Sequence, residues 1–162
     1  MTPDPARIRE ASTADLDALV ALERATFASD RISRVQWRRH IGSGTACVLV
    51  AGPPGRVEGA AVVFLRRNSR RARLYSLAVA ASSRGRGLAR SLLAAAEDEA
   101  RRRGCNALDL EVRTDNRAAL ALYERHGYRR VVRLQGFYED AADGWRFSKA
   151  LADRSQRRTQ AS

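Results

Sequence analysis

One segment constrains this chain more than any other: SSRGRGLARSLL, at residues 82–93. Gly85 and Gly87 lie among three arginines, and an apolar helical pattern follows directly. The first backbone N–H groups of a helix have no partner within the helix, and the helix dipole adds partial positive charge there. Glycine lets an anion approach these amides closely, and arginine adds forked hydrogen-bond donors. The segment therefore predicts a turn that binds a diphosphate at the start of a helix.

The flanking sequence supports this interpretation, because a predicted strand precedes the turn and a long helix follows it. The strand covers residues 74–80, and the helix extends to about Arg103, before Gly104 ends it. The turn lacks the G-x-G-x-x-G of dinucleotide-binding proteins and the G-x-x-x-x-G-K-[ST] of a Walker loop. The alternative is a plain glycine turn with solvated arginines. The buried stripe of the helix is expected, at i, i+4 spacing, at Leu88, Leu92, Ala96 and Ala100.

The other hydrophobic patterns predict a mixed order of strands and helices. Strands are expected at residues 6–12, 46–52, 57–66, 106–114, 128–134 and 144–151. Helices are expected at residues 16–27, after a capping pair at Ser12 and Asp15, at residues 33–41, and at residues 116–126, started by Asp115. The basic stretch at residues 67–73 is expected to be an exposed loop. Because the middle strands follow one another without helices, we expect a mixed α/β fold around a partly antiparallel central sheet, not a doubly wound fold.

The length of 162 residues fits one domain, which we expect to span residues 1–151, followed by a frayed basic tail at residues 152–162. No apolar run approaches the roughly 18 residues of a membrane span, and the N-terminus lacks the apolar core of a secretory signal. We therefore expect a cytoplasmic protein without a membrane partner. Cys47 and Cys105 belong to no C-x-x-C or Cys/His cluster, so we expect reduced thiols and no metal site.

The net charge of +12, with a pI near 11.2, suits an anionic partner such as nucleic acid, a membrane surface or a polyphosphate cofactor. Nearly all of this charge is arginine, and Lys149 is the only lysine, so a compositional bias toward arginine explains the excess equally well. A nucleic-acid-binding protein is the less favoured interpretation. Aromatic residues make up only 6% of the chain, the arginines are dispersed, and no nucleic-acid motif is present.

The pattern R-x-x-G-x-A at residues 84–89 resembles the R/Q-x-x-G-x-G/A motif of the GNAT superfamily of N-acetyltransferases. The longer stretch at residues 74–93 is similar to that family's strand–loop–helix segment. A second stretch, LEVRTDNRAALALYERHGY at residues 110–128, resembles the ribosomal-protein alanine acetyltransferase branch of the family, as do residues 136–151. The resemblance extends from about residue 7 to residue 151, and its motifs are specific in combination and weaker singly.

The resemblance implies a sheet of six to seven strands with about four helices, and acetyl-CoA in a notch between two splayed parallel strands, residues 74–80 and 107–113. The backbone of Leu77, Ala78 and Val79 would pair with the pantetheine arm, and the Val79 amide would polarise the thioester carbonyl. Asn116 matches an asparagine that contacts the cofactor beyond the splay, although it can also simply begin a helix. The diphosphate would contact the turn, which Arg84 holds, at Gly85, Arg86, Gly87, Leu88, Ala89 and Arg90.

Glu111 and Tyr123 match the proton acceptor and the proton donor of that branch. The resemblance implies that a neutral amine attacks the acetyl carbonyl, that Glu111 accepts the amine proton directly or through water, and that Tyr123 protonates the CoA sulfur. Strand alternation places Glu111 opposite Leu110 and Val112, toward a cleft, although an exposed strand glutamate has the same pattern. Tyr123 lies on an apolar helical stripe, so its ring can also serve packing alone.

The resemblance suggests a protein or peptide N-terminal α-amine as acceptor, for example that of a ribosomal protein. An α-amine has a pKa of about 7.7–8.0, against about 10.4 for lysine, and therefore suits a carboxylate base better. The alternatives are a lysine side chain, a small-molecule amine such as a polyamine or aminoglycoside, and a non-catalytic acyl-CoA-binding module, which the presence of Glu111 and Tyr123 disfavours. The acidic stretch at residues 139–143 is either a rim that receives an amine or a solvated turn. The sequence is compatible with a monomer and with a homodimer.

Overall fold

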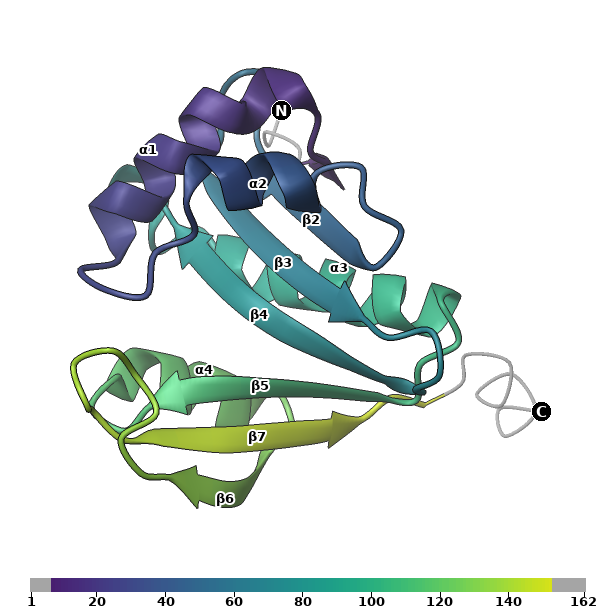
Figure 1. The fold of residues 1–162 in the computed structure, drawn as a ribbon, viewed down its shortest axis with the longest axis vertical. Helices are drawn as coiled ribbons and strands as arrows, with labels where there is room; N and C mark the ends of the chain where they lie inside the picture. Colours follow the sequence, from purple (N-terminus) through teal and green to yellow (C-terminus); the bar gives the residue numbers. More distant parts are fainter. Residues whose placement is uncertain (1–6, 153–162) are drawn as a thin grey trace.

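The computed structural model describes residues 7–152; residues 1–6 and 153–162, which include most of the expected basic tail, lie outside the described part. A seven-stranded mixed sheet forms its centre, and helices cover both faces of the sheet (Figure 1). This arrangement confirms the expected mixed α/β fold. In chain order, the elements are β1 (Ile8–Glu10), α1 (Leu16–Thr26), α2 (Arg34–His40), β2 (Ala46–Ala51), β3 (Gly59–Leu65), β4 (Arg71–Val79), α3 (Leu88–Arg102), β5 (Ala107–Arg113), α4 (Arg117–Arg125), β6 (Arg129–Leu134) and β7 (Gly144–Ala150).

The sheet forks between its two parallel strands. Its order is β1-β2-β3-β4-β5-β7-β6, and every neighbouring pair is antiparallel except β4 and β5. These two strands pair only from Arg71 opposite Ala107 to Leu74 opposite Leu110. Figure 1 shows β4 and β5 meeting at one end and diverging toward the other. The splayed pair that the family resemblance implies is therefore confirmed.

The expected exposed loop at residues 67–73 is wrong for its last three residues, because β4 begins at Arg71. Arg71 forms an ion pair with Asp109 at 2.7 Å, and Arg73 forms one with Glu111 at 3.0 Å; both carboxylates belong to β5. Opposite charges on neighbouring strands stabilise a sheet. A run of arginines that is typical of a loop on its own is thus accommodated in a strand by its partner.

Two buried clusters hold the helices on the sheet. The first lies between the sheet and α3 with α4, and it buries the predicted α3 stripe of Leu88, Leu92, Ala96 and Ala100. The second lies between α1, α2 and strands β2–β4, and it includes Leu19, Trp37 and Val62. Among the described residues, no member of β5 or β7 belongs to this second cluster. The face of β5 that bears Glu111 therefore has no helix packed on it.

Candidate active site

The predicted anion-binding turn lies between β4 and α3. Gly85 and Gly87 have φ angles of 84° and 77°, a left-handed conformation that favours glycine. No atom lies within 4 Å of the position that a Cβ would take at either residue, so backbone conformation rather than crowding requires glycine. The Ser91 N–H donates to the Gly87 carbonyl oxygen at 3.0 Å, which is the first hydrogen bond of α3. The amides of residues 88–90 therefore have no partner within the helix.

The side chains around this turn comprise two apolar groups and three exposed cations. Leu88 is buried in the core and Ala89 is half-buried, so both would meet a ligand through their amides. Arg84, Arg86 and Arg90 are exposed, and no carboxylate within residues 7–152 forms an ion pair with any of them. The turn thus combines free amides, the positive end of a helix dipole and three uncompensated guanidinium groups. This combination suits a polyanion such as a diphosphate.

The end of β4 presents backbone groups to the gap beside β5. The Ala80 N–H donates to the Glu58 carbonyl oxygen at 2.8 Å, so these two residues are hydrogen-bonded partners just beyond the β3–β4 ladder. Bonded and non-bonded pairs alternate along an antiparallel ladder. Ala78 therefore also faces β3, whereas Leu77 and Val79 point their amides toward the fork. Of the three residues predicted to pair with a pantetheine arm, two have the required backbone direction.

Glu111 lies one residue beyond the last position of β5 that pairs with β4, on the face opposite Leu110 and Val112. Its side chain is only 8% exposed, unlike a solvated strand glutamate. The Arg73 Nε donates to its Oε2 at 3.0 Å, and the Arg146 Nη2 donates to its Oε1 at 3.4 Å. All three charged side chains line a pocket of about 350 Å³. Glu111 thus points into a pocket, as strand alternation predicts.

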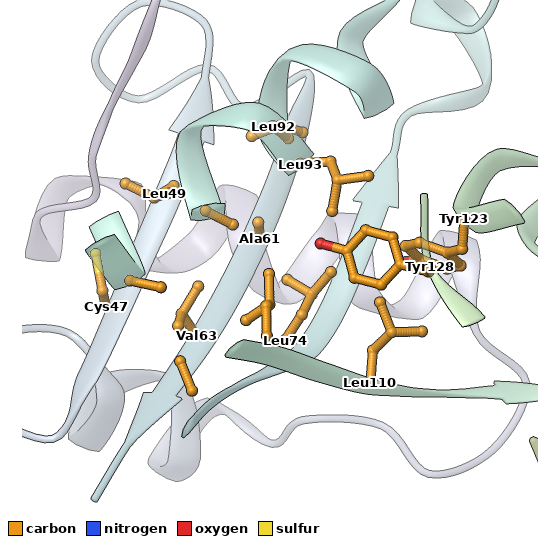
Figure 2. Close-up of a cluster of buried hydrophobic side chains, with 14 of the residues drawn as sticks. Cys47, Leu49, Ala61, Val63, Leu74, Leu92, Leu93, Leu110, Tyr123 and Tyr128 are labelled. Atoms are coloured by element: carbon orange, nitrogen blue, oxygen red, sulfur yellow. The ribbon is translucent and has the colours of Figure 1, made fainter. Parts of the chain in front are cut away.

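Tyr123 projects from α4 into the core beside β5. Its ring makes an edge contact with Tyr128, with centroids 5.6 Å apart, and a tilted contact with Phe147 at 6.5 Å (Figure 2 shows the two tyrosines). Burial raises the pKa of the Tyr123 phenol well above its ordinary value, so the group is protonated at neutral pH. None of the hydrogen bonds found within residues 7–152 involves its hydroxyl group. The ring therefore serves packing, and the phenolic proton is available to a ligand.

Glu111 and Tyr123 lie on opposite sides of β5. Leu110, the neighbour of Glu111 in the strand, belongs to the buried cluster that contains Tyr123 and lies beside it in Figure 2. Glu111 faces the other way, toward the uncovered side of the sheet. The open end of the fork therefore has a carboxylate on one face of β5 and a phenol on the other.

Asn116 begins α4, one residue later than the predicted start at Asp115. Its Oδ1 accepts the Ala119 N–H at 3.1 Å, which is an N-cap hydrogen bond. Asp115 instead forms an ion pair with Arg113 at 3.4 Å. Asparagine and aspartate are nearly equivalent as caps, so the sequence does not separate the two positions. Asn116 is thus the residue that starts the helix, and its amide nitrogen is left to contact a ligand.

Three further residues lie beside Glu111 and are not picked out by the sequence motifs. Arg73 falls in the stretch interpreted as a loop, and Arg146 lies on β7 directly opposite Glu111. Tyr138, from the β6–β7 connection, has a pKa raised to about 12, first by burial and then by the charge of Glu111. Arginines at alternate positions of β4 and carboxylates at alternate positions of β5 were a usable signal for Arg73 but not for Arg146. Nothing in the sequence indicates Tyr138.

The acidic stretch at residues 139–143 forms a structured turn. Asp140 forms an ion pair with Arg113 at 2.6 Å, and Asp143 forms one with Arg133 at 2.9 Å. Because these carboxylates are already paired with arginines, the turn interpretation is favoured over an acidic rim that receives an amine.

Comparison with known proteins identifies the family. A family model described as the acetyltransferase (GNAT) family matches residues 15–128. The chain belongs to the GNAT family. The matched segment contains the glycine turn, the fork of β4 and β5, Glu111 and Tyr123, so the GNAT resemblance inferred from the motifs is confirmed.

The relatives include N-terminal and ribosomal-protein acetyltransferases. The N-alpha-acetyltransferase 30 of Schizosaccharomyces pombe is 35% identical over 82 residues, which are 51% of this GNAT chain and 55% of the relative, so the match spans about half of that protein. The ribosomal-protein-S18-alanine N-acetyltransferase from Escherichia coli has a TM-score of 0.79 at 26% identity over 90% of this chain and 94% of its own. A chain of the NatC complex bound to Gag peptide and CoA has a TM-score of 0.77 at 25% identity, over 92% of this chain and 100% of its own.

Both cysteines of this GNAT chain are buried and unpaired. Burial raises the pKa of the Cys47 thiol to about 12 and also raises that of Cys105, which disfavours the nucleophilic thiolate form of both. Within the described residues, no group of three or more His, Cys, Asp or Glu side chains could hold a metal ion.

None of the described helices is long and apolar enough to cross a membrane.

Proposed function

We propose that this GNAT protein transfers the acetyl group of acetyl-CoA to a primary amine, the α-amine of a protein or peptide N-terminus, by direct attack in a ternary complex. The observation that carries the proposal is the fork of β4 and β5. An anion-binding turn follows the open end of the fork, and Glu111 and Tyr123 flank it from opposite faces. The names of the relatives, an N-alpha-acetyltransferase and a ribosomal-protein alanine N-acetyltransferase, support the same class of acceptor.

The residues around the fork fit acetyl-CoA, which would supply an activated acetyl thioester. The amides of residues 85–90, with their arginines and Arg84, would hold its diphosphate. The inward-facing amides of Leu77 and Val79 would pair with the pantetheine arm, and that of Val79 would polarise the thioester carbonyl. Asn116 would add its side-chain nitrogen near the start of α4. The CoA in the NatC structure, whose chain shares this fold at 25% identity, supports this co-substrate.

Two protons move in the proposed reaction, and we assign each to one protein group. As the amine nitrogen bonds to the acetyl carbon and the C–S bond breaks, Glu111 takes the amine proton, directly or through water. Arg73 and Arg146 hold the Glu111 carboxylate in the pocket. Tyr123 gives its proton to the departing sulfur, and its raised pKa ensures that it carries that proton beforehand. The buried cysteines support a mechanism without a covalent enzyme intermediate.

An N-terminal α-amine suits this site better than a lysine side chain. The α-amine pKa is lower by about 2.5 units, so its deprotonation at neutral pH costs about 3.5 kcal/mol less. A single carboxylate is then a sufficient base. The N-terminus of a ribosomal protein is one acceptor of this kind, and similarity to the Escherichia coli enzyme supports it.

A thiol-release screen tests the proposal. Purified protein and acetyl-CoA are incubated with four kinds of acceptor: peptides with a free N-terminus, N-terminally blocked peptides that contain lysine, a polyamine and an aminoglycoside. We expect CoA release with the free peptides and acetylation of their α-amine by mass spectrometry. Faster turnover of the lysine peptide or of either small amine would overturn the acceptor class. CoA binding without turnover of any amine would instead indicate a non-catalytic module.

A further inference from the structure

A positively charged pocket lies beside Glu111, on the face of the sheet that α1 and α2 cover only over β2–β4. It has a volume of about 350 Å³, and it extends from the paired ends of β4 and β5 to Glu111, the first residue of β5 beyond that pairing. The charged side chains that line it are Arg66, Arg71, Arg73, Arg146, Asp109 and Glu111. Four guanidinium groups against two carboxylates leave an excess of two positive charges in this pocket.

Arg71 and Asp109 form a closed pair with little capacity for a ligand. The Arg71 Nε and Nη2 donate to the two Asp109 carboxylate oxygens at 2.8 and 2.7 Å, and Nη2 also donates to the Ser148 Oγ at 2.9 Å. This bidentate geometry occupies one side of the guanidinium group and both carboxylate oxygens. The excess charge therefore lies with the other three arginines.

Arg73 and Arg146 share a single carboxylate. Each donates one nitrogen to a different oxygen of Glu111, and their side chains are 41% and 42% exposed. Arg73 is also held over the ring of Tyr75, 5.3 Å from its centroid. Both arginines consequently keep N–H donors that are free for a ligand in the pocket.

Arg66 carries the second uncompensated charge. It follows β3 directly, it is exposed, and no carboxylate within the described part of the chain forms an ion pair with it. The next residue, Arg67, is equally exposed but does not line the pocket. The two neighbours therefore differ in position and not in charge.

We propose that the acceptor carries a carboxylate within a few bonds of its reacting amine, and that Arg66, Arg73 and Arg146 bind this carboxylate. The inference rests on the proposed function. Excess positive charge disfavours an ammonium group and so favours the neutral, nucleophilic amine. A carboxylate on the same molecule offsets the repulsion through forked, charge-assisted hydrogen bonds. An acidic side chain at the first or second position of a peptide would supply it, and so would the α-carboxylate of a free amino acid.

The test compares kcat/KM for acceptors with and without this carboxylate. The pairs are peptides with Asp or Asn at position 1, peptides with Asp or Asn at position 2, and free alanine against alaninamide. We expect the acidic member of at least one pair to react at least about tenfold faster, and the pair that responds identifies the source of the carboxylate. Equal rates within every pair overturn the inference and leave the proposed function intact. Absence of thiol release from every acceptor overturns both.

A matched pair of variants tests the pocket itself. Arg66→Gln should lower the acidic-to-neutral ratio of kcat/KM by about threefold, whereas Arg67→Gln should leave that ratio and the basal rate unchanged. Arg66→Glu should lower the ratio further and favour a lysine at the responding position. An equal effect of Arg66→Gln and Arg67→Gln would show that the overall charge of the chain sets the preference, and it would overturn the assignment to the pocket.

Discussion

Glu111 differs from other paired carboxylates in its location rather than in its partners. Glu99 of α3 also forms ion pairs with two arginines, Arg102 at 2.6 Å and Arg103 at 3.0 Å. Glu99, however, lines a separate cavity beside β1, whereas Glu111 lies at the fork of β4 and β5. Glu99 is therefore a matched control for the proposed role of Glu111 as the base.

Glu111→Gln should lower kcat by about 10²- to 10⁴-fold, because the amide keeps the size of the side chain but accepts no proton from the amine. The affinity for CoA, measured by calorimetry, should be unchanged. Glu99→Gln, the matched control, should keep the wild-type kcat. Normal turnover of Glu111→Gln would remove this residue as the base.

Two neighbouring tyrosines should show opposite effects when their hydroxyl groups are removed. Tyr123→Phe should lower kcat by about 100-fold with almost no change in stability, because its hydroxyl group has no partner within residues 7–152. Tyr128→Phe should leave kcat unchanged and lower the free energy of unfolding by about 1–2 kcal/mol, because its hydroxyl donates to buried Glu97 at 2.9 Å. Thiol release and urea unfolding measure the two effects. Equal kcat losses in both variants would contradict the assignment of Tyr123 as the acid.

At the scale of elements, diphosphate binding by the turn before α3 can be tested with two substitutions of equal size that differ in charge. Gly87→Asp should raise the Kd for CoA at least about tenfold, because it places a negative charge where the diphosphate is expected. Gly87→Asn has the same shape and the same positive φ, with a strain of about 1 kcal/mol, but no charge. It should weaken binding much less. If both variants bind CoA equally well, the diphosphate lies elsewhere.

The junction between β1 and α1 is fastened by Asp15, whose side chain is fully buried. It accepts two hydrogen bonds from Arg9, at 2.8 and 2.7 Å, and one each from the Ser12 and Gly55 N–H groups. The bonds from Arg9 outweigh the opposing effect of burial and hold the Asp15 pKa far below its usual value. The folded state thus binds this proton more weakly than the unfolded state does. The resulting stability is present above the unfolded pKa, about 3.9, and is lost as the pH falls toward the folded one.

Asp15→Asn should therefore lower the free energy of unfolding at pH 7 by about 2–4 kcal/mol, and the difference from wild type should shrink below about pH 4. Asp17→Asn serves as the control, because Asp17 is 88% exposed and its ion pair with Arg34 should contribute less than about 1 kcal/mol. Urea unfolding across this pH range measures both. A difference for Asp15→Asn that is independent of pH would contradict the role of its charge.

Most elements follow from local patterns, and the exceptions have a common cause. The α3 stripe and the strands on either side of it are set by hydrophobic periodicity, which is local. The start of β4 depends on Asp109 and Glu111, far along the chain, so the arginines before Leu74 have the composition of a loop until the sheet assembles. The arginine-lined pocket has the same origin, because β3, β4, β5 and β7 each contribute to it.

At the scale of the whole molecule, one buried cluster spans both arms of the fork. It extends from Leu49 of β2 through α3 to Tyr123 of α4 and Phe147 of β7, and Figure 2 shows its central part. Packing behind the sheet therefore fixes the positions of the two arms relative to each other. We infer that the gap between β4 and β5 exists before the co-substrate binds, which the hydrophobic pattern of separate segments cannot reveal.

A crystal structure of the protein with CoA tests the central claim most directly. The account predicts the diphosphate on the amides of residues 85–90, the pantetheine arm beside the amides of Leu77 and Val79, and the sulfur between Glu111 and Tyr123. CoA bound on another surface, with the turn and the fork both empty, would contradict it.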